Sequence, residues 1–261
     1  MAAENSRYPE VLDFIQASGR RIVKQAGTLA DIGTKKRFLT DEDLRIEREL
    51  LTLTQRLFPG DGFLAEEEHD TVPTETSYWV CDPISGTRTF LAGLAHFGIA
   101  VARVADGKPV FAAVYDPTMD ELFEACAGAG ALCNKKPLRV TDAPGPDGPR
   151  VLFNLTYEYE APDEAERIWH DLAGYDTYRN TNSFGVNYGH VAMGRYDGFV
   201  SLTKDAFPEV AGSLIVREAG GKFVCLDGGD EVRAAGRRFL GGAPWLVDKL
   251  LEDEVARASS C

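Results

Sequence analysis

The stretch at residues 79–87, Trp-Val-Cys-Asp-Pro-Ile-Ser-Gly-Thr, constrains this chain more than any other. The apolar residues 78–81 are typical of a buried strand, and the acidic Asp82 follows them directly. Ser-Gly-Thr at 85–87 then favours the start of a helix. Here a strand ends in a carboxylate and a helix begins directly after it. The carboxylate, a potential metal ligand, therefore lies beside backbone N–H groups that have no acceptor within the helix. We therefore predict that a phosphate ester is held and attacked here.

Composition narrows the classes of function. The 261 residues suffice for one large α/β unit or for two smaller lobes that share a core. The net charge of −13 argues against nucleic acid or an anionic membrane as a partner, because phosphate groups bind basic surfaces. No run approaches the roughly 20 apolar residues of a membrane span, and the amino-terminal segment has no apolar signal core. We expect a cytoplasmic protein whose five cysteines, which lack metal-ligand spacing, are reduced thiols.

Hydrophobic spacing predicts alternating helices and strands. A helix is expected over 8–26 and a second over 40–57, where Thr40 and Asp43 form a capping box. The other elements are expected as strands over 78–81, 97–104, 110–115, 121–125, 131–134, 151–153, 198–202 and 222–226, and as helices over 162–173, 186–193, 207–219 and 244–256. Antiparallel hairpins fill the first half, so we predict an α/β fold of the layered α+β kind, in which helix and sheet layers alternate.

Residues 141–150, rich in Pro, Gly and Asp, are the predicted linker between two lobes. The N-terminal α+β lobe, 1–141, carries the metal and phosphate motifs. The C-terminal α/β lobe is expected over 150–261.

A series of short motifs supports a more specific prediction. In chain order they are Thr-Asp-Glu-Asp at 40–43, Phe-Leu-Ala-Glu-Glu at 63–67, Asp-Pro-Ile-Ser-Gly-Thr at 82–87, Val-Tyr-Asp-Pro at 114–117, Gly-x-Gly-Ala at 128–131, Val-Ala-Met-Gly-Arg at 191–195 and Glu-Ala-Gly-Gly at 218–221. Together they resemble the inositol monophosphatase family of magnesium-dependent, lithium-sensitive sugar phosphatases. The resemblance covers nearly the whole chain and implies that family's fold.

The resemblance also implies the metal ligands. Glu66, Asp82 and the main-chain carbonyl of Ile84 would hold the first Mg²⁺, which prefers oxygen ligands and retains several waters. Ser85 stands where the family has an aspartate that bridges the first two metals, and Pro208 where another aspartate anchors the second. Two carboxylates are therefore missing, and we expect one metal site and a second that is very weak or absent.

Two acidic residues near Pro208 are the alternatives as substitute ligands. Asp205 lies three positions before the proline and Glu209 one position after it. Glu209 lies one helical step, about 100°, from the lost ligand, so its longer side chain would have to reach back. Because Mg²⁺ demands strict ligand geometry, we do not favour such a replacement.

The remaining roles also come from the resemblance. Asp43 and Thr87 would position and deprotonate the attacking water, and the N–H groups of Gly86 and Thr87 would bind the phosphate oxygens. Ser201 stands where inositol phosphatases have a glutamate that contacts the sugar hydroxyls. The loops around 175–183 and 201–205 would set specificity. The expected substrate-binding residues are Ser85, Gly86, Thr87, Ser201 and Asp205.

Two functional hypotheses follow. The first is a Mg²⁺-dependent phosphomonoesterase that hydrolyses a small phosphorylated metabolite, such as a sugar, cyclitol or nucleotide-derived phosphate, by a metal-activated water. The second is a protein of the same fold that binds a phosphorylated ligand without hydrolysing it, or that catalyses another reaction. We favour the first, because Asp43, Glu66, Asp82 and Thr87 are all present. The family resemblance also implies a homodimer.

Each motif also has a purely structural interpretation. Asp43 can cap the helix that follows Thr40, Ser-Gly-Thr at 85–87 can be an ordinary helix cap, and the acidic run 66–68 can be a solvated loop. Only the occurrence of all these motifs together, in this order along the chain, favours a functional site over the structural interpretations.

Overall fold

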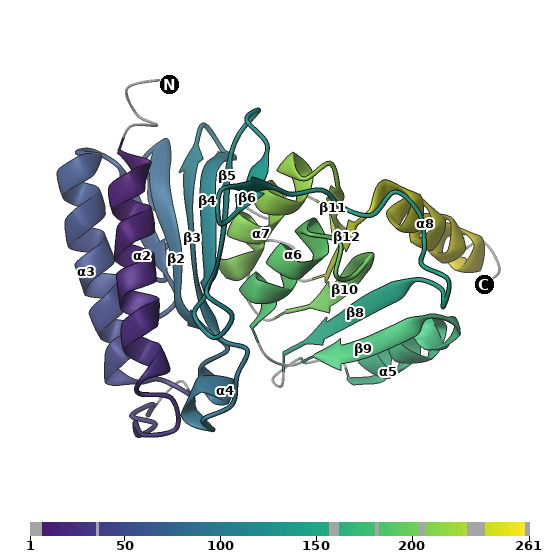
Figure 1. Ribbon diagram of the computed structural model, residues 1–261, viewed down its shortest axis with the longest axis horizontal. Coiled ribbons are helices and arrows are strands. Elements are labelled where there is room, and N and C mark those ends of the chain that lie inside the picture. Colours follow the sequence, from purple (N-terminus) through teal and green to yellow (C-terminus); the bar gives the residue numbers. More distant parts are fainter. Residues whose placement is uncertain are drawn as a thin grey trace.

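The structure, a computed structural model, describes residues 7–34, 37–156, 162–180, 183–203, 207–228 and 238–258. Two β-sheets alternate with three layers of helices (Figure 1). This arrangement confirms the predicted α/β layered fold. Each sheet contains parallel strands whose carboxyl ends lie at one edge, where functional residues can meet.

The first sheet has seven strands in sequence order. They are β1 (Gly62–Ala65), β2 (Ser77–Ser85), β3 (Gly98–Ala105), β4 (Lys108–Asp116), β5 (Glu121–Cys126), β6 (Ala131–Cys133) and β7 (Lys136–Pro137). β1 runs parallel to β2, and the following neighbours are antiparallel. β2 continues to Ser85, beyond the strand predicted over 78–81. Asp82 pairs with Ala100 and Ser85 with Gly98, and the register shift between them forms a bulge that accommodates the intervening proline.

Two helices, α2 (Tyr8–Val23) and α3 (Asp41–Leu57), cover the outer face of this sheet (Figure 1). Val11, Ile15 and Ile22 recur at helical spacing on α2 and are fully buried. Both helices are predicted from the sequence, although the first ends at Val23 rather than at residue 26. Between β2 and β3 lies the short helix α4 (Thr87–Leu91).

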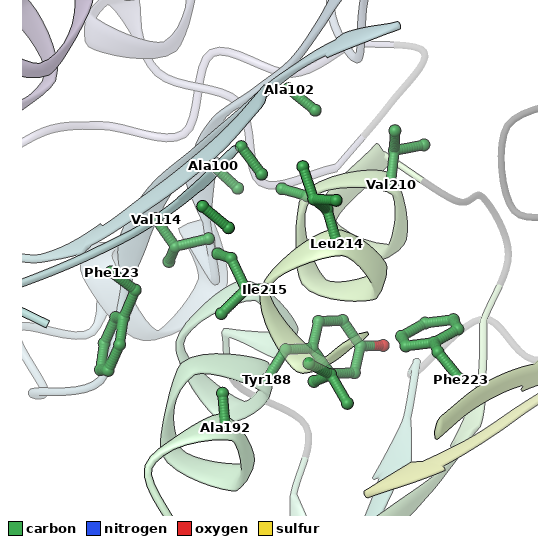
Figure 2. Close-up of a cluster of buried hydrophobic side chains, with 14 of the residues drawn as sticks. Ala100, Ala102, Val114, Phe123, Tyr188, Ala192, Val210, Leu214, Ile215 and Phe223 are labelled. Carbon is green, nitrogen blue, oxygen red and sulfur yellow. The ribbon is translucent and has the colours of Figure 1, made fainter. Parts of the chain in front are cut away.

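The middle layer consists of α6 (Phe184–Ala192) and α7 (Phe207–Glu218), which lie between the two sheets (Figure 1). Every residue of α6 is buried, as expected for a helix that packs on both sides. Figure 2 shows Leu214 and Ile215 of α7 beside Val114 of the first sheet. A Cβ on Gly212 would lie 2.1 Å from the Tyr188 ring, so only glycine allows α7 to approach α6 this closely.

The second sheet has the strand order β11-β12-β10-β8-β9. Its elements are β8 (Arg150–Leu155), β9 (Asp176–Asn180), β10 (Gly198–Leu202), β11 (Lys222–Cys225) and β12 (Arg238–Gly242), with α5 (Pro162–Asp171), the 3₁₀ turn Leu172–Gly174 and α8 (Pro244–Ala258). β8, β9 and β10 are parallel, so their carboxyl ends lie at one edge. The strands β9 and β12 are not predicted, because one is polar and the other ends in two glycines.

One buried core joins the two sides of the predicted linker. Leu152 and Phe199 of the second sheet belong to the same apolar cluster as Val114 of the first. The division of the chain at 141–150 stays a prediction. In the part of the chain that is described, no helix is long and apolar enough to cross a bilayer. The four cysteines in that part, which include Cys81, form no disulfide.

Candidate active site

The parallel pairing of β1 with β2 brings two acidic side chains to one edge of the sheet. Ala65 lies opposite Cys81 in the ladder, so the next residues, Glu66 and Asp82, follow adjacent strand positions. Asp82 is buried, whereas Glu66 is partly exposed. Burial raises the pKa of the Cys81 thiol well above its ordinary value, and negative charges including those of Glu47, Asp82 and Glu66 raise it further. The predicted carboxylate ligands therefore lie in one electronegative region.

Glu47 of α3 anchors the loop that carries Glu66. Its fully buried carboxylate accepts hydrogen bonds from the backbone N–H groups of Glu67, at 3.1 Å, and Glu68, at 2.9 Å. It also lies 2.6 Å from Nδ1 of His69. Sequence reasoning missed this residue. The sequence does contain one signal for Glu47, because it lies one turn after Asp43 on the same face of a helix.

Thr87 connects the end of β2 to α3. Its hydroxyl lies 2.8 Å from the carbonyl oxygen of Ile84 and 3.4 Å from Oδ1 of Asp43. A hydroxyl has one proton to donate, so the short contact to Ile84 is the stronger hydrogen bond. The structure thus brings together Asp43, Ile84 and Thr87, three of the residues predicted to form the site.

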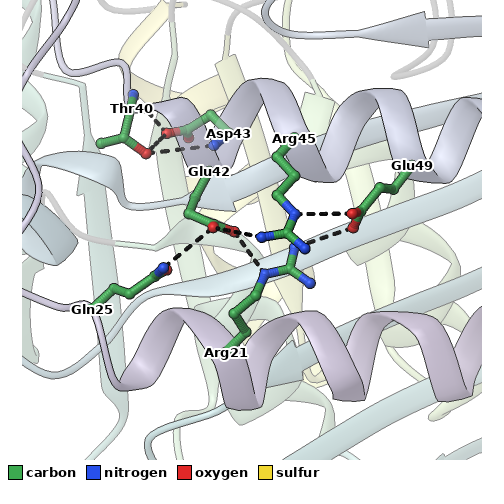
Figure 3. A network of polar contacts seen from close by, with 7 residues as sticks. All are labelled: Arg21, Gln25, Thr40, Glu42, Asp43, Arg45 and Glu49. Atoms are coloured by element: carbon green, nitrogen blue, oxygen red, sulfur yellow. Dashed lines mark hydrogen bonds and ion pairs between the residues drawn. The ribbon is translucent and has the colours of Figure 1, made fainter.

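Asp43 is fully buried and also caps α3 (Figure 3). Its Oδ2 accepts hydrogen bonds from the backbone N–H of Thr40, at 2.8 Å, and from the Thr40 hydroxyl, at 2.5 Å. The Asp43 N–H donates to that hydroxyl at 3.4 Å. The structural and functional interpretations of Asp43 are therefore compatible, because Oδ2 caps the helix while Oδ1 faces Thr87.

Ionic contacts between α2 and α3 fix the start of α3 (Figure 3). The carboxylate of Glu42 accepts from Arg21, at 2.8 Å, and from Gln25, at 3.3 Å. Glu49 contacts both Arg21 and Arg45. This network holds the helix that carries Asp43 and Glu47 against its neighbour.

The segment after β2 lies against the start of α6. Gly86 has a φ of 90°, a left-handed conformation that favours glycine. A Cβ there would also lie 2.9 Å from the backbone nitrogen of Ser183, the residue that caps α6. The Ser85 hydroxyl accepts a long hydrogen bond, 3.4 Å, from the N–H of Gly185. Gly86 and Thr87 begin α4, where the first N–H groups have no acceptor within their own helix.

Ser201 lies apart from these residues, at the carboxyl end of β10. It is fully buried, and its hydroxyl is 2.9 Å from Nδ2 of Asn154 and 3.0 Å from the hydroxyl of Tyr188. The Tyr188 hydroxyl in turn donates to Glu209 at 2.8 Å. Glu209 is thus bound within the middle layer of the fold. Asp205 lies outside the described residues.

A few oxygen donors gather at these strand ends. Across the described ranges, no group of three or more His, Cys, Asp or Glu side chains is placed to bind a metal. The available oxygens are those of Glu66, Asp82 and the Ile84 carbonyl. Mg²⁺ accepts one or two carboxylates when waters complete its coordination, so this set fits one such ion. Ser85 and Pro208 offer no carboxylate to this set.

The two sheets and the helix layers around them define a protein of the layered α/β class. A sequence profile of the inositol monophosphatase family matches residues 13–260. The chain is 32% identical to an inositol-1-monophosphatase of Rhizobium meliloti over 84% of its length and 83% of that protein, and 30% identical to the Nus factor SuhB of Escherichia coli over 85% of both. The solved structure of the SuhB protein of Bartonella henselae superposes with a TM-score of 0.81 and 25% identity, covering 92% of this chain and 95% of the other. This chain belongs to the inositol monophosphatase family, a family of hydrolases that generally depend on metal ions.

Proposed function

We propose that this phosphatase is a Mg²⁺-dependent phosphomonoesterase that hydrolyses a small phosphorylated metabolite. One observation carries the proposal: the hydroxyl of Thr87 lies within reach of both the Ile84 carbonyl and the Asp43 carboxylate. These groups adjoin the strand ends that deliver Glu66 and Asp82. Such an arrangement would supply a proton acceptor beside a set of hard oxygen ligands.

Glu66, Asp82 and the carbonyl of Ile84 would hold a single Mg²⁺ ion. When bound, the ion would offset negative charge on the phosphoryl group. The second family site would be too weak to contribute, because a serine hydroxyl at Ser85 is neutral and Pro208 has no side-chain oxygen.

The protein groups would then perform the following chemistry. Thr87 and Asp43 orient a water molecule towards phosphorus, and the Asp43 carboxylate accepts a proton from that water. The bond from the water oxygen to phosphorus forms as the ester bond breaks, and the departing alkoxide takes a proton from solvent. The backbone N–H groups of Gly86 and Thr87 donate to the phosphate oxygens.

The substrate proposed here is a sugar, cyclitol or nucleotide-derived phosphate other than plain inositol phosphate. Ser201 replaces a glutamate that would bind sugar hydroxyls, and its hydroxyl is already bonded to Asn154 and Tyr188. A pocket without that carboxylate favours a ligand with fewer hydroxyls at that point.

Release of inorganic phosphate from a panel of esters tests the function. We expect turnover that requires added Mg²⁺ and stops with a chelator, and one Mg²⁺ site by calorimetry. Asp82→Asn should abolish turnover, because a neutral amide is a poor ligand for a hard cation. Full turnover in that variant rejects the proposal.

A second candidate function is supported by the two missing carboxylates and by the relative named a Nus factor. In this case the protein binds a phosphorylated ligand without hydrolysing it, or acts within a complex. The charge of −13 disfavours direct binding of nucleic acid. Tight binding of a phosphate ester, with no phosphate release from any ester at saturating Mg²⁺, would select this candidate. The homodimer and the cytoplasmic location stay predictions.

A further inference from the structure

The loop that follows β1 is folded around a single buried carboxylate. β1 ends at Ala65, and the backbone N–H of Ala65 donates to the carbonyl oxygen of His69 at 2.8 Å. This hydrogen bond closes a short loop, residues 66–69, which we call the acidic loop. Glu47 of α3 accepts hydrogen bonds from two backbone N–H groups of this loop. One side chain outside the acidic loop therefore holds its backbone.

His69 supplies a third donor to that carboxylate. Glu47 accepts backbone N–H groups with both oxygens, as an ionised carboxylate does, and Nδ1 of His69 lies 2.6 Å from its Oε1. An ionised carboxylate only accepts, so Nδ1 carries the proton. Glu47 is fully buried, whereas the His69 side chain is 36% exposed. A buried charge is costly unless hydrogen bonds satisfy it, so loss of the His69 donor should weaken the attachment of the acidic loop to α3.

The imidazole ring of His69 has a defined orientation. It meets the Phe63 ring edge-on, with the ring centroids 5.6 Å apart and the ring planes at 89°. Phe63 belongs to β1, so His69 packs on the strand that leads into the acidic loop and donates to the helix α3. Because the ring is already held by this packing, its hydrogen bond to Glu47 forms at little further cost in conformational entropy.

The contacts with α3 also distinguish the glutamates of the acidic loop. The carboxylate of Glu68 forms a bidentate ion pair with Arg48, with distances of 2.7 and 2.5 Å. Arg48 follows Glu47 directly, so two successive residues of α3 bind the loop. Glu66 is the first residue after β1, and the pairing of β1 with β2 places it beside Asp82. The far part of the acidic loop is thus bound to α3, while Glu66 lies at the strand end.

The helix α3 carries both the proposed base and the contacts of the acidic loop. Asp43 lies 3.4 Å from Thr87, and Glu47 lies one turn further along the helix. Both carboxylates are fully buried. One rigid element therefore supports the acidic loop and the pair proposed to orient water. Mg²⁺ demands near-ideal geometry, so a ligand on a loop has to be held in place to bind it well.

We propose that His69 is a positioning residue for the proposed metal ligand Glu66. It acts through Glu47, which holds the backbone of the acidic loop, and it does not contact the ion itself. This inference rests on the proposed Mg²⁺ site, but it does not require hydrolysis. It assigns a role to a histidine that lies outside the motifs of the family resemblance.

Calorimetry of Mg²⁺ binding to the full-length protein tests this role. His69→Ala removes the donor, and we expect the Mg²⁺ Kd to rise about tenfold, as for other groups that orient a metal ligand. His69→Asn keeps an N–H group near the position of Nδ1, and its Kd should stay within about twofold of the wild type. The matched control is His170→Ala, because His170 also faces a glutamate, Glu166, but on the exposed surface of α5. Equal Mg²⁺ affinity of His69→Ala and the wild type overturns the proposal, and so does an asparagine variant as weak as the alanine one.

Amide hydrogen exchange in the metal-free protein separates positioning from general destabilisation. The two N–H groups that donate to Glu47 should exchange about tenfold faster in His69→Ala than in the wild type. The N–H groups of Thr118 and Met119 are the internal control, because they also donate to a buried carboxylate, that of Asp116, at 2.8 and 3.2 Å. A merely structural role would speed exchange equally at both places, and that result contradicts positioning.

These measurements separate this inference from the proposed function. A wild type that binds Mg²⁺ but releases no phosphate from any ester refutes hydrolysis, and the Mg²⁺ Kd values still decide the role of His69. Normal phosphate release, with equal Mg²⁺ affinity in the wild type and His69→Ala, refutes this inference alone. A wild type that binds no Mg²⁺ at millimolar concentration refutes both.

Discussion

The carboxylate of Asp43 and the hydroxyl of Thr87 meet at 3.4 Å, although 44 positions separate them in the sequence. The capping box at Thr40 fixes one carboxylate oxygen, so the other is held towards Thr87. Helix capping and the proposed proton transfer are thus functions of the same side chain.

Thr87→Ala should lower kcat about 100-fold or more, because it removes the hydroxyl proposed to orient water beside Asp43. Thr87→Ser keeps the hydroxyl and should retain most of the activity. Steady-state hydrolysis of one ester at saturating Mg²⁺ is the measurement. Equal activity of the alanine and serine variants contradicts this role for the hydroxyl.

Gly86→Ala should disturb both stability and the site. The new Cβ would lie 2.9 Å from the Ser183 nitrogen, and a φ of 90° is unfavourable for alanine. Gly60→Ala is a matched control, because Gly60 has a similar φ of 98° and no atom within 4 Å of the added carbon. Chemical unfolding and phosphate binding should both be affected more at Gly86. Equal effects at the two glycines would show that backbone strain alone matters.

Glu47→Gln should destabilise the loop that carries Glu66. The carboxylate accepts N–H groups with both oxygens, whereas a glutamine would turn its own NH₂ group towards one of them. We expect a loss of about 1–3 kcal/mol in the free energy of unfolding and Mg²⁺ binding weakened about tenfold. Glu10→Gln, at an exposed ion pair with Arg56, is the control and should change neither value appreciably.

His190 should make the protein sensitive to mild acid. The pKa of His190 is lowered from 6.5 to about 4, chiefly because the side chain is buried and then because the positive charge of Arg195 lies nearby. Below pH 6.5 the unfolded chain binds a proton at this residue that the folded protein does not bind, so stability falls as the pH is lowered from 6.5 to 4. The difference corresponds to about 3 kcal/mol.

The check is a comparison of denaturant unfolding at pH 7 and pH 4.5 for the wild type and His190→Gln. Glutamine cannot be protonated, so the variant should lose less stability over this interval. His170→Gln, on the exposed side of α5, should follow the wild type. Identical losses in wild type and His190→Gln would exclude this histidine as the cause.

Much of this fold follows from local patterns. Thr40 and Asp43 predict the start of α3 correctly, because a capping box is a short-range interaction. The run 78–81 predicts a buried strand but not its continuation to Ser85, since a proline normally ends a strand and only the bulge opposite β3 accommodates it. β12 is missed because its pairing partners, β10 and β11, are set by tertiary structure rather than by its own Gly-rich sequence.

The site is predictable only in part for the same reason. Ser85–Thr87 and Asp82 are recognisable because they occur in one short motif. Glu47 is not, because its contacts with the backbone at Glu67 and Glu68 exist only after α3 packs near β1. The hydrogen bond from Asn187 of α6 to Asn154 of β8 likewise forms only once these two elements pack together, although an asparagine within a largely apolar helix is a usable signal.

The middle layer described above has a consequence for how this protein can vary. α6 is buried along its whole length and α7 along most of it. A larger side chain there would clash with a neighbouring element, as a Cβ on Gly212 would clash with the Tyr188 ring. The outer helices α2 and α3 each turn one face to solvent and can accept new side chains on it. In a saturation library of the chain, few substitutions should therefore be tolerated in α6 and α7, and many on the exposed faces of α2 and α3. Homologous enzymes that are engineered for new esters would best be varied outside the middle layer.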